Sequence, residues 1–309
     1  MTRVILYFLV FFQIGCQSKF SGSSVNEELK DNNSNDFSFA VIADLNGGER
    51  EGVFENAVSK INRMHPVFTL SVGDLIDGGI TDSQEIELQW ETFDQRLKKL
   101  NSPFYYVGGN HDLSNVEMVE SWEKRYGPTY YHFKYKDVLF LILNSEDYSN
   151  QRFNEIFEAR DLALKVLSGE VEGEYEETEY FNMTERSFGD MSDEQLNYFE
   201  NVIKENEDAR WTFLFMHKPL WKNKNNQKFQ SLLEKLKTRE YSVFSGHEHS
   251  FSQELINGKS FTILATTGGS QNPNNPNAFD HFTWISMKEK PSVSHFLLDG
   301  VLNERGLNN

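Results

Sequence analysis

The chain has 309 residues, of which 38% are hydrophobic and 14% aromatic, so it is too apolar for an intrinsically disordered protein. It carries 47 acidic residues against 30 Lys and Arg, a formal net charge of −17, which argues against non-specific nucleic-acid binding because that requires a basic surface. The single cysteine, Cys16, excludes an internal disulfide framework and a cysteine-based zinc site.

The first 15 residues predict an export signal. Arg3 precedes an apolar run over residues 4–12, which is too short to span a membrane because a spanning helix needs about 20 apolar residues. The run leads to Gly-Cys, which resembles the end of a bacterial lipoprotein signal, so Cys16 would become the lipidated first residue. An ordinary signal peptide with an incidental cysteine, or a buried first strand, are the alternatives. We therefore expect an exported protein of the cell envelope, held to the membrane by a lipid on Cys16.

A polar segment at residues 16–36 is typical of a flexible tether, so we expect the folded domain over residues 37–300. In the first part of this domain, apolar runs alternate with segments of helical spacing. In chain order the predicted elements are strand Phe37–Ala43, helix Gly52–Met64, strand Val67–Val72, helix Ser83–Leu100, strand Phe104–Val107, helix Val116–Arg125, and a hairpin of strands Tyr130–Tyr135 and Val138–Leu143.

Residues 145–190 interrupt this alternation and contain the acidic run Glu170–Glu179. The run favours a solvated surface insertion over an acidic binding element. Because the insertion lies between core strands, it could still overhang a site formed at their ends. The elements predicted after it are helix Ser192–Glu205 with Ser192 as N-cap, strand Trp211–Met216, helix Phe229–Lys237, and strands Tyr241–Phe244, Phe251–Ile256, Phe261–Ala265, Phe282–Met287 and Ser292–Leu298.

This order of elements predicts an α/β protein. The first half alternates strands and helices, and the last fifth is mostly strands, so we expect two mixed β-sheets packed as a sandwich flanked by α-helices. Several strands end in loops rich in Gly, Asp, Asn and His. Such loops place polar side chains at one sheet edge, where α/β proteins usually bind ligands.

Five polar clusters follow predicted strands, and together they indicate a metal site. They are Asp44-Leu45-Asn46, Gly73-Asp74, Gly109-Asn110-His111-Asp112, His217, and Gly246-His247-Glu248-His249. Each cluster alone is weak evidence, because a single His or Asp after a strand is more often structural. Combined carboxylate, amide and imidazole donors without thiols favour Mn, Fe or Zn over Ca, and two ions fit if one carboxylate bridges them.

In this order, the clusters resemble the motifs of the calcineurin-like metallophosphoesterase superfamily, in the branch near the purple acid phosphatases. The family pattern is Asp-x-His, Gly-Asp-x-x-Asp, Gly-Asn-His-Asp or -Glu, a lone His, and Gly-His-x-His. The similarity extends over most of residues 37–300, and the later segment Ala265–Gly269 resembles the one that follows the last ligand in that branch. The resemblance implies a two-sheet sandwich and a centre of two divalent metal ions.

The resemblance also implies a role for each matched residue. One ion would be held by Asp44, Asp74 and His249. The other would be held by Asp74 as the bridging ligand, Asn110, His217 and His247. As catalytic residues, His111 would reach the phosphate or the leaving group and Asp112 would support it.

The first motif departs from the family because Asn46 stands where the family usually has His. An amide oxygen can ligate a hard cation, but it is a weaker donor to Zn or Fe than imidazole. Asn46 is therefore a candidate ligand of the first ion, which would bind loosely, prefer Mn or Mg, or take water in its place.

Two functions are compatible with these residues. The first is a metal-dependent phosphoesterase that hydrolyses a phosphate monoester or diester, on a small molecule or a macromolecule, by attack of a metal-bound hydroxide. The second is an exported metal- or ligand-binding lipoprotein with a weakened first metal site and little turnover, which Asn46 and the acidic insertion favour. We expect no stable nucleic-acid binding, and the superfamily hosts too many substrates for the fold to select one.

Overall fold

The computed structural model describes residues 35–46, 48–298, 302–303 and 306–307. The predicted export signal, Cys16 and all of the predicted tether except residues 35–36 lie outside the described residues. In the described part of the chain, no helix is both long enough and apolar enough to cross a membrane.

The first of two mixed sheets has five strands in the order β11-β10-β1-β2-β3. Strands β1, β2 and β3 are parallel, and β10 runs antiparallel to β1 and β11. Their bounds are β1 Phe37–Ile42, β2 Thr69–Ser71, β3 Phe104–Tyr105, β10 His281–Met287 and β11 Pro291–Leu297. A separate two-stranded sheet pairs β12 (Leu302–Asn303) with β13 (Gly306–Leu307).

The second mixed sheet has six strands in the order β4-β5-β6-β7-β9-β8. Strands β5, β6, β7 and β9 are parallel, and the two edge strands are antiparallel to their neighbours. Their bounds are β4 Tyr131–Tyr135, β5 Val138–Ile142, β6 Trp211–Phe215, β7 Tyr241–Ser245, β8 Ser252–Ile256 and β9 Lys259–Ile263.

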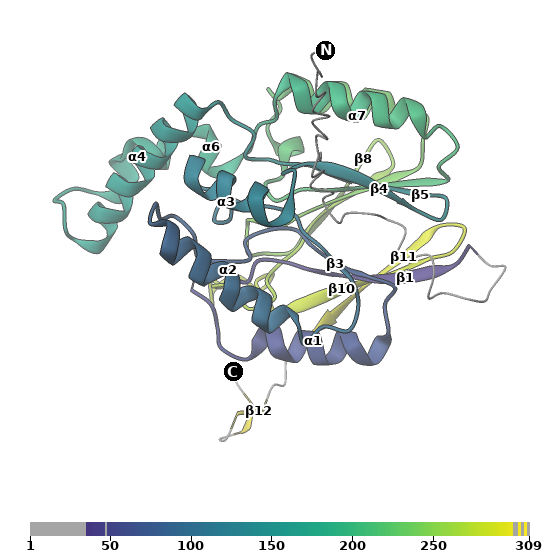
Figure 1. Cartoon of the computed structure of the whole chain (residues 1–309), viewed down its shortest axis with the longest axis horizontal. Coiled ribbons are helices and arrows are strands. Elements are labelled where there is room, and N and C mark those ends of the chain that lie inside the picture. The colour runs from purple at the N-terminus through teal and green to yellow at the C-terminus, as the bar shows by residue number, and fades with distance from the viewer. Residues whose placement is uncertain (1–34, 47, 299–301, 304–305, 308–309) are drawn as a thin grey trace, which may run out of the picture. The chain divides into compact units, whose positions relative to one another are not determined.

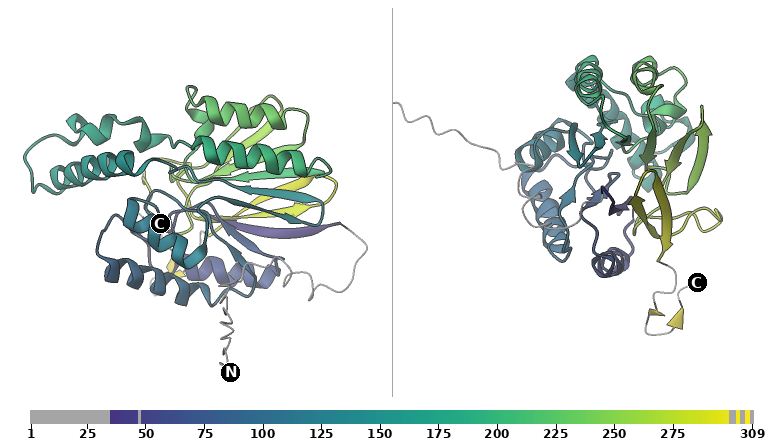
Figure 2. Two further views of the ribbon diagram at one scale, coloured as in Figure 1. Left: turned by 45° about the horizontal axis from the view of Figure 1, so that its top comes forward. Right: turned by 90° about the vertical axis from the view of Figure 1, so that its right-hand side faces the viewer.

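Helices cover the outer faces of both sheets. Figures 1 and 2 show α1 and α2 on one side of the sheets and α7 on the opposite side. The helices outside the insertion are α1 Val53–Met64, α2 Ser83–Leu97, α3 Val116–Tyr126, α7 Asp193–Glu205, the short 3-10 helix η2 Leu220–Lys222, and α8 Gln227–Leu236. The predicted sandwich of two mixed sheets flanked by helices is confirmed.

The two sheets pack through aromatic side chains. The ring of Phe39 in β1 lies 5.4 Å, centroid to centroid, from Phe140 in β5 and also 5.4 Å from Phe213 in β6. The neighbours of Phe39 on the other face of β1, Ala40 and Ile42, pack against helices α1 to α3. Strand β1 is therefore buried on both faces, which explains why its sequence after Ser38 is a continuous apolar run rather than an alternating one.

The predicted N-cap of α7 is confirmed, because the Ser192 hydroxyl accepts the Gln195 N–H at 3.0 Å.

Several predicted elements differ in length from the observed ones. The strand predicted over Phe104–Val107 is limited to β3, because the N–H of Val107 donates to the Ser71 hydroxyl at 3.0 Å instead of joining the backbone ladder.

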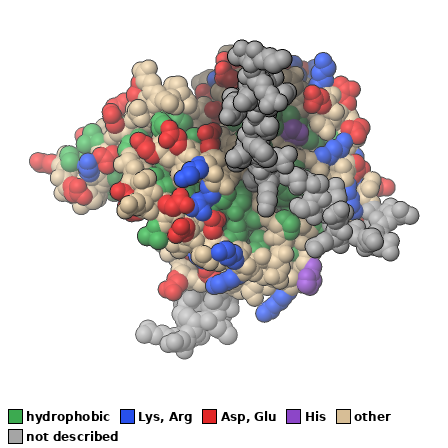
Figure 3. Space-filling view, viewed as in Figure 1, with side chains coloured by type: hydrophobic (Ala, Val, Ile, Leu, Met, Phe, Trp, Pro, Cys, Tyr) green, Lys and Arg blue, Asp and Glu red, His purple; other side chains and the backbone are tan. Residues whose placement is uncertain are grey.

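The insertion at residues 145–190 folds into helices that the sequence analysis did not predict. They are α4 Asn150–Ser168, the 3-10 helix η1 Tyr175–Glu177, α5 Glu179–Asn182 and α6 Thr184–Ser187. In Figure 1 the far part of α4 projects from the body of the domain, and Figure 3 shows acidic side chains over this arm. Most of the acidic run 170–179 is exposed, in agreement with its interpretation as a solvated segment.

Candidate metal centre

The predicted ligands lie in loops at the carboxyl ends of strands from both sheets. Asp44 and Asp74 follow β1 and β2, while His217 and the pair His247 and His249 follow β6 and β7. The ligand atoms of Asp44, Asp74 and His249 all lie within 4.8 Å of one another. The Nε2 atom of His249 is 3.5 Å from Oδ1 of Asp44. These three side chains therefore converge as the ligand set of the first ion requires.

Asp74 lies between this group and a second one. The Nε2 atom of His217 is 3.1 Å from Oδ2 of Asp74 and 3.2 Å from Oδ1 of Asn110. The His217 ring is also next to His247, with ring centroids 5.2 Å apart. Asp74 is thus the carboxylate common to both groups, which is the position of a bridging ligand.

Backbone carbonyls orient all four imidazoles. A carbonyl only accepts hydrogen bonds, so the ring nitrogen that meets it carries the proton. Three rings donate through Nδ1–H: His111 to the Asp77 carbonyl at 2.6 Å, His217 to the Val72 carbonyl at 2.8 Å, and His249 to the Ser270 carbonyl at 2.6 Å. His247 donates instead through Nε2–H, to the Arg186 carbonyl at 2.9 Å. The other ring nitrogen, Nδ1 in His247 and Nε2 in the other three, is left for a ligand once it carries no proton, as metal-binding histidines require.

Asn46, two residues after Asp44, is buried, and the Nδ2 atom of its side chain has no hydrogen-bond partner in the described part of the chain. Oδ2 of Asp44 is likewise buried without a partner among the described residues. The O and N atoms of a side-chain amide are assigned from their hydrogen bonds, so a rotated Asn46 amide would place its oxygen at the unpartnered position. A cation would satisfy the unpartnered Asp44 oxygen, and a rotated Asn46 amide offers a second oxygen, so the types of donor present fit a metal ion.

Four candidate ligands have strained backbone conformations. Asp44, Asp74, His247 and His249 have φ values of 30°, 55°, 74° and 49°, in a region that residues with a Cβ rarely adopt. The loops also pack too closely for added side-chain atoms, because a Cβ on Gly246 would lie 2.3 Å from Oδ2 of Asp44. Such strain is typical of functional sites, where surrounding contacts hold the side chains in position.

Burial and the charges of neighbouring side chains set the ionisation of the candidate ligands. Burial raises the pKa of Asp44 to about 6, despite the opposing effect of His249 and His217. Burial also disfavours ionised Asp74, but the positive charges of His217 and His111 hold the pKa of Asp74 well below its usual value. Burial would lower the pKa of His217, yet the Asp74 carboxylate raises it to about 9. In His247, burial and nearby Lys218 lower the pKa, so this imidazole is neutral and able to ligate.

The Asp112 carboxylate joins two of the site loops. It is fully buried and accepts the N–H groups of Leu75 at 2.8 Å, Ile76 at 3.1 Å and Gly109 at 2.9 Å. The orientation of His111, in contrast, comes from the Asp77 carbonyl. Asp112 therefore positions the Asp74 and Asn110 loops relative to each other, whereas its support of His111 stays a prediction.

The end of the insertion also contributes to the site. The sequence analysis named no residue of the insertion that makes such a contact. The Arg186 carbonyl orients His247, and the Glu185 carbonyl accepts from Nζ of Lys218 at 2.7 Å. Lys218 in turn forms a buried ion pair with Glu146 at 2.7 Å. Backbone carbonyls have no residue-type signature, so no motif could have identified the first two contacts.

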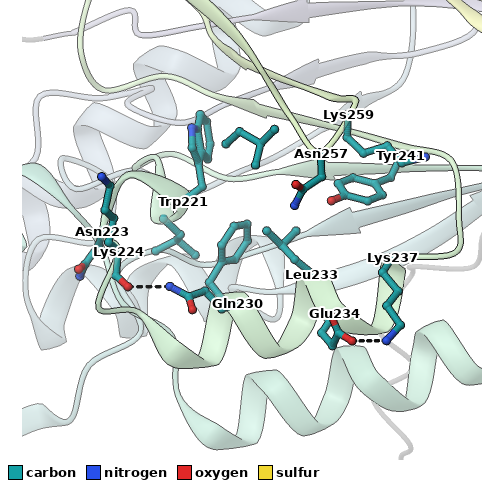
Figure 4. A pocket seen from close by; sticks show the side chains of 13 residues that line it. Trp221, Asn223, Lys224, Gln230, Leu233, Glu234, Lys237, Tyr241, Asn257 and Lys259 are labelled. Atoms are coloured by element: carbon teal, nitrogen blue, oxygen red, sulfur yellow. Dashed lines mark hydrogen bonds and ion pairs between the residues drawn. The ribbon is translucent and has the colours of Figure 1, made fainter.

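Figure 4 shows a separate pocket of about 340 Å³ between α8 and strands β7 to β9. Trp221, Leu233 and Tyr241 supply apolar surface, and the ion pair of Glu234 with Lys237 lies at its rim. None of the candidate metal ligands lines this pocket. It is therefore not part of the candidate centre.

Comparison with solved structures places the fold. The chain superimposes on a dimetal phosphatase of Danio rerio with a TM-score of 0.59 and 16% identity, over 84% of this chain and 96% of that one. A purple acid phosphatase from yellow lupin, Lupinus luteus, gives a TM-score of 0.52 and 11% identity, over 85% of this chain and 51% of that one. At these identities the similarity concerns the fold alone.

Sequence comparison identifies the family. The chain is 30% identical to mouse serine/threonine-protein phosphatase CPPED1 over 224 residues, 65% of this chain and 60% of that protein. Identity with the human CPPED1 is 36% over 103 residues, 31% of this chain and 32% of that protein. The matches thus span about one third to three fifths of these relatives. The family model for calcineurin-like phosphoesterases matches residues 37–251, so the chain belongs to the calcineurin-like phosphoesterase family.

Proposed function

We propose that this protein is a metal-dependent phosphoric ester hydrolase with a centre of two divalent cations, for which Mn, Fe or Zn are the candidates. The observation that carries the proposal is the position of Asp74, whose carboxylate lies within the cluster of Asp44 and His249 and 3.1 Å from Nε2 of His217. Bound divalent cations would lower the pKa of a coordinated water and neutralise charge on the phosphoryl oxygens. This local positive charge lets a chain of net charge −17 bind an anion.

The protein's own residues supply orientation and a proton. Asp44, Asp74 and His249 would hold one cation, with Asn46 as a further oxygen donor. Asp74, Asn110, His217 and His247 would hold the other. The His111 ring is fixed through Nδ1 by the Asp77 carbonyl, and in its protonated form it would give the Nε2 proton to the leaving oxygen, a role worth about 10²–10⁴-fold in rate.

The substrate proposal is a phosphate ester on a small molecule or a protein. The curated relatives are serine/threonine-protein phosphatases by name, which supports phosphorylated substrates for this chain as well. We also propose, from the sequence of residues 1–16, that the protein is exported and tethered to the cell envelope by a lipid on Cys16. Replacing Cys16 by Ser should release the protein from membranes, and an unchanged membrane fraction would exclude the tether.

The direct test uses the full chain, stripped of metal and refilled separately with Mn, Fe, Zn or Mg. Hydrolysis of p-nitrophenyl phosphate is compared with hydrolysis of bis-p-nitrophenyl phosphate, with Asp74→Asn as the blank. Metal-dependent turnover that is absent from the blank supports the enzyme and separates monoester from diester preference. Absence of turnover with every metal would favour the second candidate, a metal-binding lipoprotein with little activity, which the amide of Asn46 at a ligand position favours.

A further inference from the structure

A small cavity borders the candidate metal centre on the side of the insertion. Its volume is about 20 Å³, and its lining includes Asn110 of the centre together with Tyr148 and Arg160 of the insertion. A space of this size accepts about one water-sized group, such as an oxygen atom of a ligand, but not a sugar or a base. The insertion therefore forms one wall of a niche next to the candidate ligands.

The charges that line this cavity do not cancel. Lys218 and Glu146 form an ion pair at 2.7 Å and neutralise each other. Arg160 is the remaining charged side chain of the lining. In the described part of the chain, its guanidinium makes no hydrogen bond or ion pair, whereas other half-buried arginines such as Arg96 and Arg125 each pair with two carboxylates. An uncompensated guanidinium in such an acidic protein favours an anionic partner.

Arg160 lies on the side of His111. A Cβ on Gly79 would be 2.6 Å from Nη1 of Arg160, so the guanidinium packs directly on this backbone. Two residues earlier, the Asp77 carbonyl holds the His111 ring. Arg160 therefore lies on the side of the centre that holds His111, the proposed proton donor to the leaving oxygen.

Tyr148 provides a second unpartnered polar group in the same lining. Its hydroxyl oxygen is buried and has no hydrogen-bond partner among the described residues. The ring packs edge-on against Phe153 of α4, with centroids 5.4 Å apart, and this contact fixes its position. A buried hydroxyl without a partner costs stability that a ligand oxygen would recover.

We propose that Arg160 and Tyr148 form a subsite for a second oxyanion, carried by the leaving group of the substrate. The subsite selects phosphate esters whose alcohol bears a carboxylate or another phosphate close to the scissile ester. This inference rests on the proposed hydrolase function and names its substrate class. It also gives the insertion a function, since both residues lie within 145–190.

The test compares three substrates that differ in one group. They are 3-carboxyphenyl phosphate, its neutral isostere 3-carbamoylphenyl phosphate, and 1,3-phenylene bisphosphate, which tests phosphate against carboxylate. For the full chain we expect kcat/KM for one or both charged substrates to exceed that for the amide by about tenfold, as a charge-assisted hydrogen bond allows. The Arg160→Gln variant should reduce this ratio towards one, and Tyr148→Phe should reduce it by a smaller factor. The matched control is Arg63→Gln, at an exposed arginine of α1, which should keep the wild-type ratio.

Each outcome decides between the proposals. A ratio near one in the wild type, or an unchanged ratio in Arg160→Gln, overturns the subsite but leaves the hydrolase function standing. If no substrate is hydrolysed, the hydrolase function fails, and protection of Arg160 from phenylglyoxal, read by peptide mass spectrometry, decides the subsite separately. We expect the charged phosphates to protect Arg160 more than the amide does, and equal protection would refute the subsite.

Discussion

The buried ion pair of Lys218 with Glu146 gives a stability prediction that depends on the tertiary structure. The two residues are only 3% and 4% exposed, and Nζ of Lys218 also donates to the Glu185 carbonyl. Lys218→Met removes the ammonium and leaves the Glu146 carboxylate buried without its partner. Breaking a buried pair in this way costs about 3–5 kcal/mol, of which the lost bond to the carbonyl accounts for about 1 kcal/mol.

The double variant Lys218→Met with Glu146→Leu separates the pair from its surroundings. With both charges gone, no carboxylate is left unpaired, so we expect a free energy of unfolding within about 1–2 kcal/mol of the wild type. The single loss should also be smaller at pH 5 than at pH 8, because burial raises the pKa of Glu146 and a protonated carboxyl tolerates burial better. Urea unfolding, followed by tryptophan fluorescence and circular dichroism at both pH values, measures the loss in the single variant, the loss in the double variant and the effect of pH on the single loss.

The matched control is an exposed pair on α4. Lys165 and Asp161 lie 2.7 Å apart, but their side chains are 47% and 51% exposed. Lys165→Met should leave the free energy of unfolding nearly unchanged, because solvent screens an exposed pair. The reasoning is refuted if Lys218→Met lowers the free energy of unfolding as little as this control does. It is also refuted if the loss in the double variant equals the sum of the losses in Lys218→Met and Glu146→Leu measured separately.

Three further predictions concern the metal centre and one buried histidine. Asp74→Asn should abolish metal-dependent turnover and reduce the number of bound cations, because it alters the one carboxylate shared by both groups. Elemental analysis measures the number of bound cations, and full activity with an unchanged number would exclude the bridging role. Asn46→His should raise the affinity for Zn or Fe relative to Mn, measured by metal titration, and identical titrations of both proteins would show that Asn46 is not a ligand. Burial lowers the pKa of His281 from 6.5 to about 3, so the folded state binds fewer protons than the unfolded state below pH 6.5, and stability falls as the pH falls. His281→Phe should remove about 1 kcal/mol of this loss per pH unit between pH 6 and 4, and parallel stability curves for variant and wild type would contradict the assignment.

The sequence by itself determined most of the order of the elements outside the insertion, together with the candidate ligands. Strand and helix periods are local properties, so apolar runs located β1, β6 and β7 within one or two residues. The polar clusters directly follow those strands, and parallel strands bring their carboxyl ends to one edge. Within each sheet, the candidate ligands were therefore expected at one edge, and the grouping of ligands from both sheets around two ions was implied by the resemblance to the phosphoesterase family.

Only the tertiary structure decided how these ligands are held. The imidazoles are oriented by the carbonyls of Val72, Asp77, Arg186 and Ser270, and any residue type can supply a carbonyl. The acidic composition of the insertion predicted a solvated surface segment. Its last turn nevertheless reaches His247 and Lys218, across 61 and 33 residues of sequence. Such long-range contacts depend on packing, which local sequence periods do not encode.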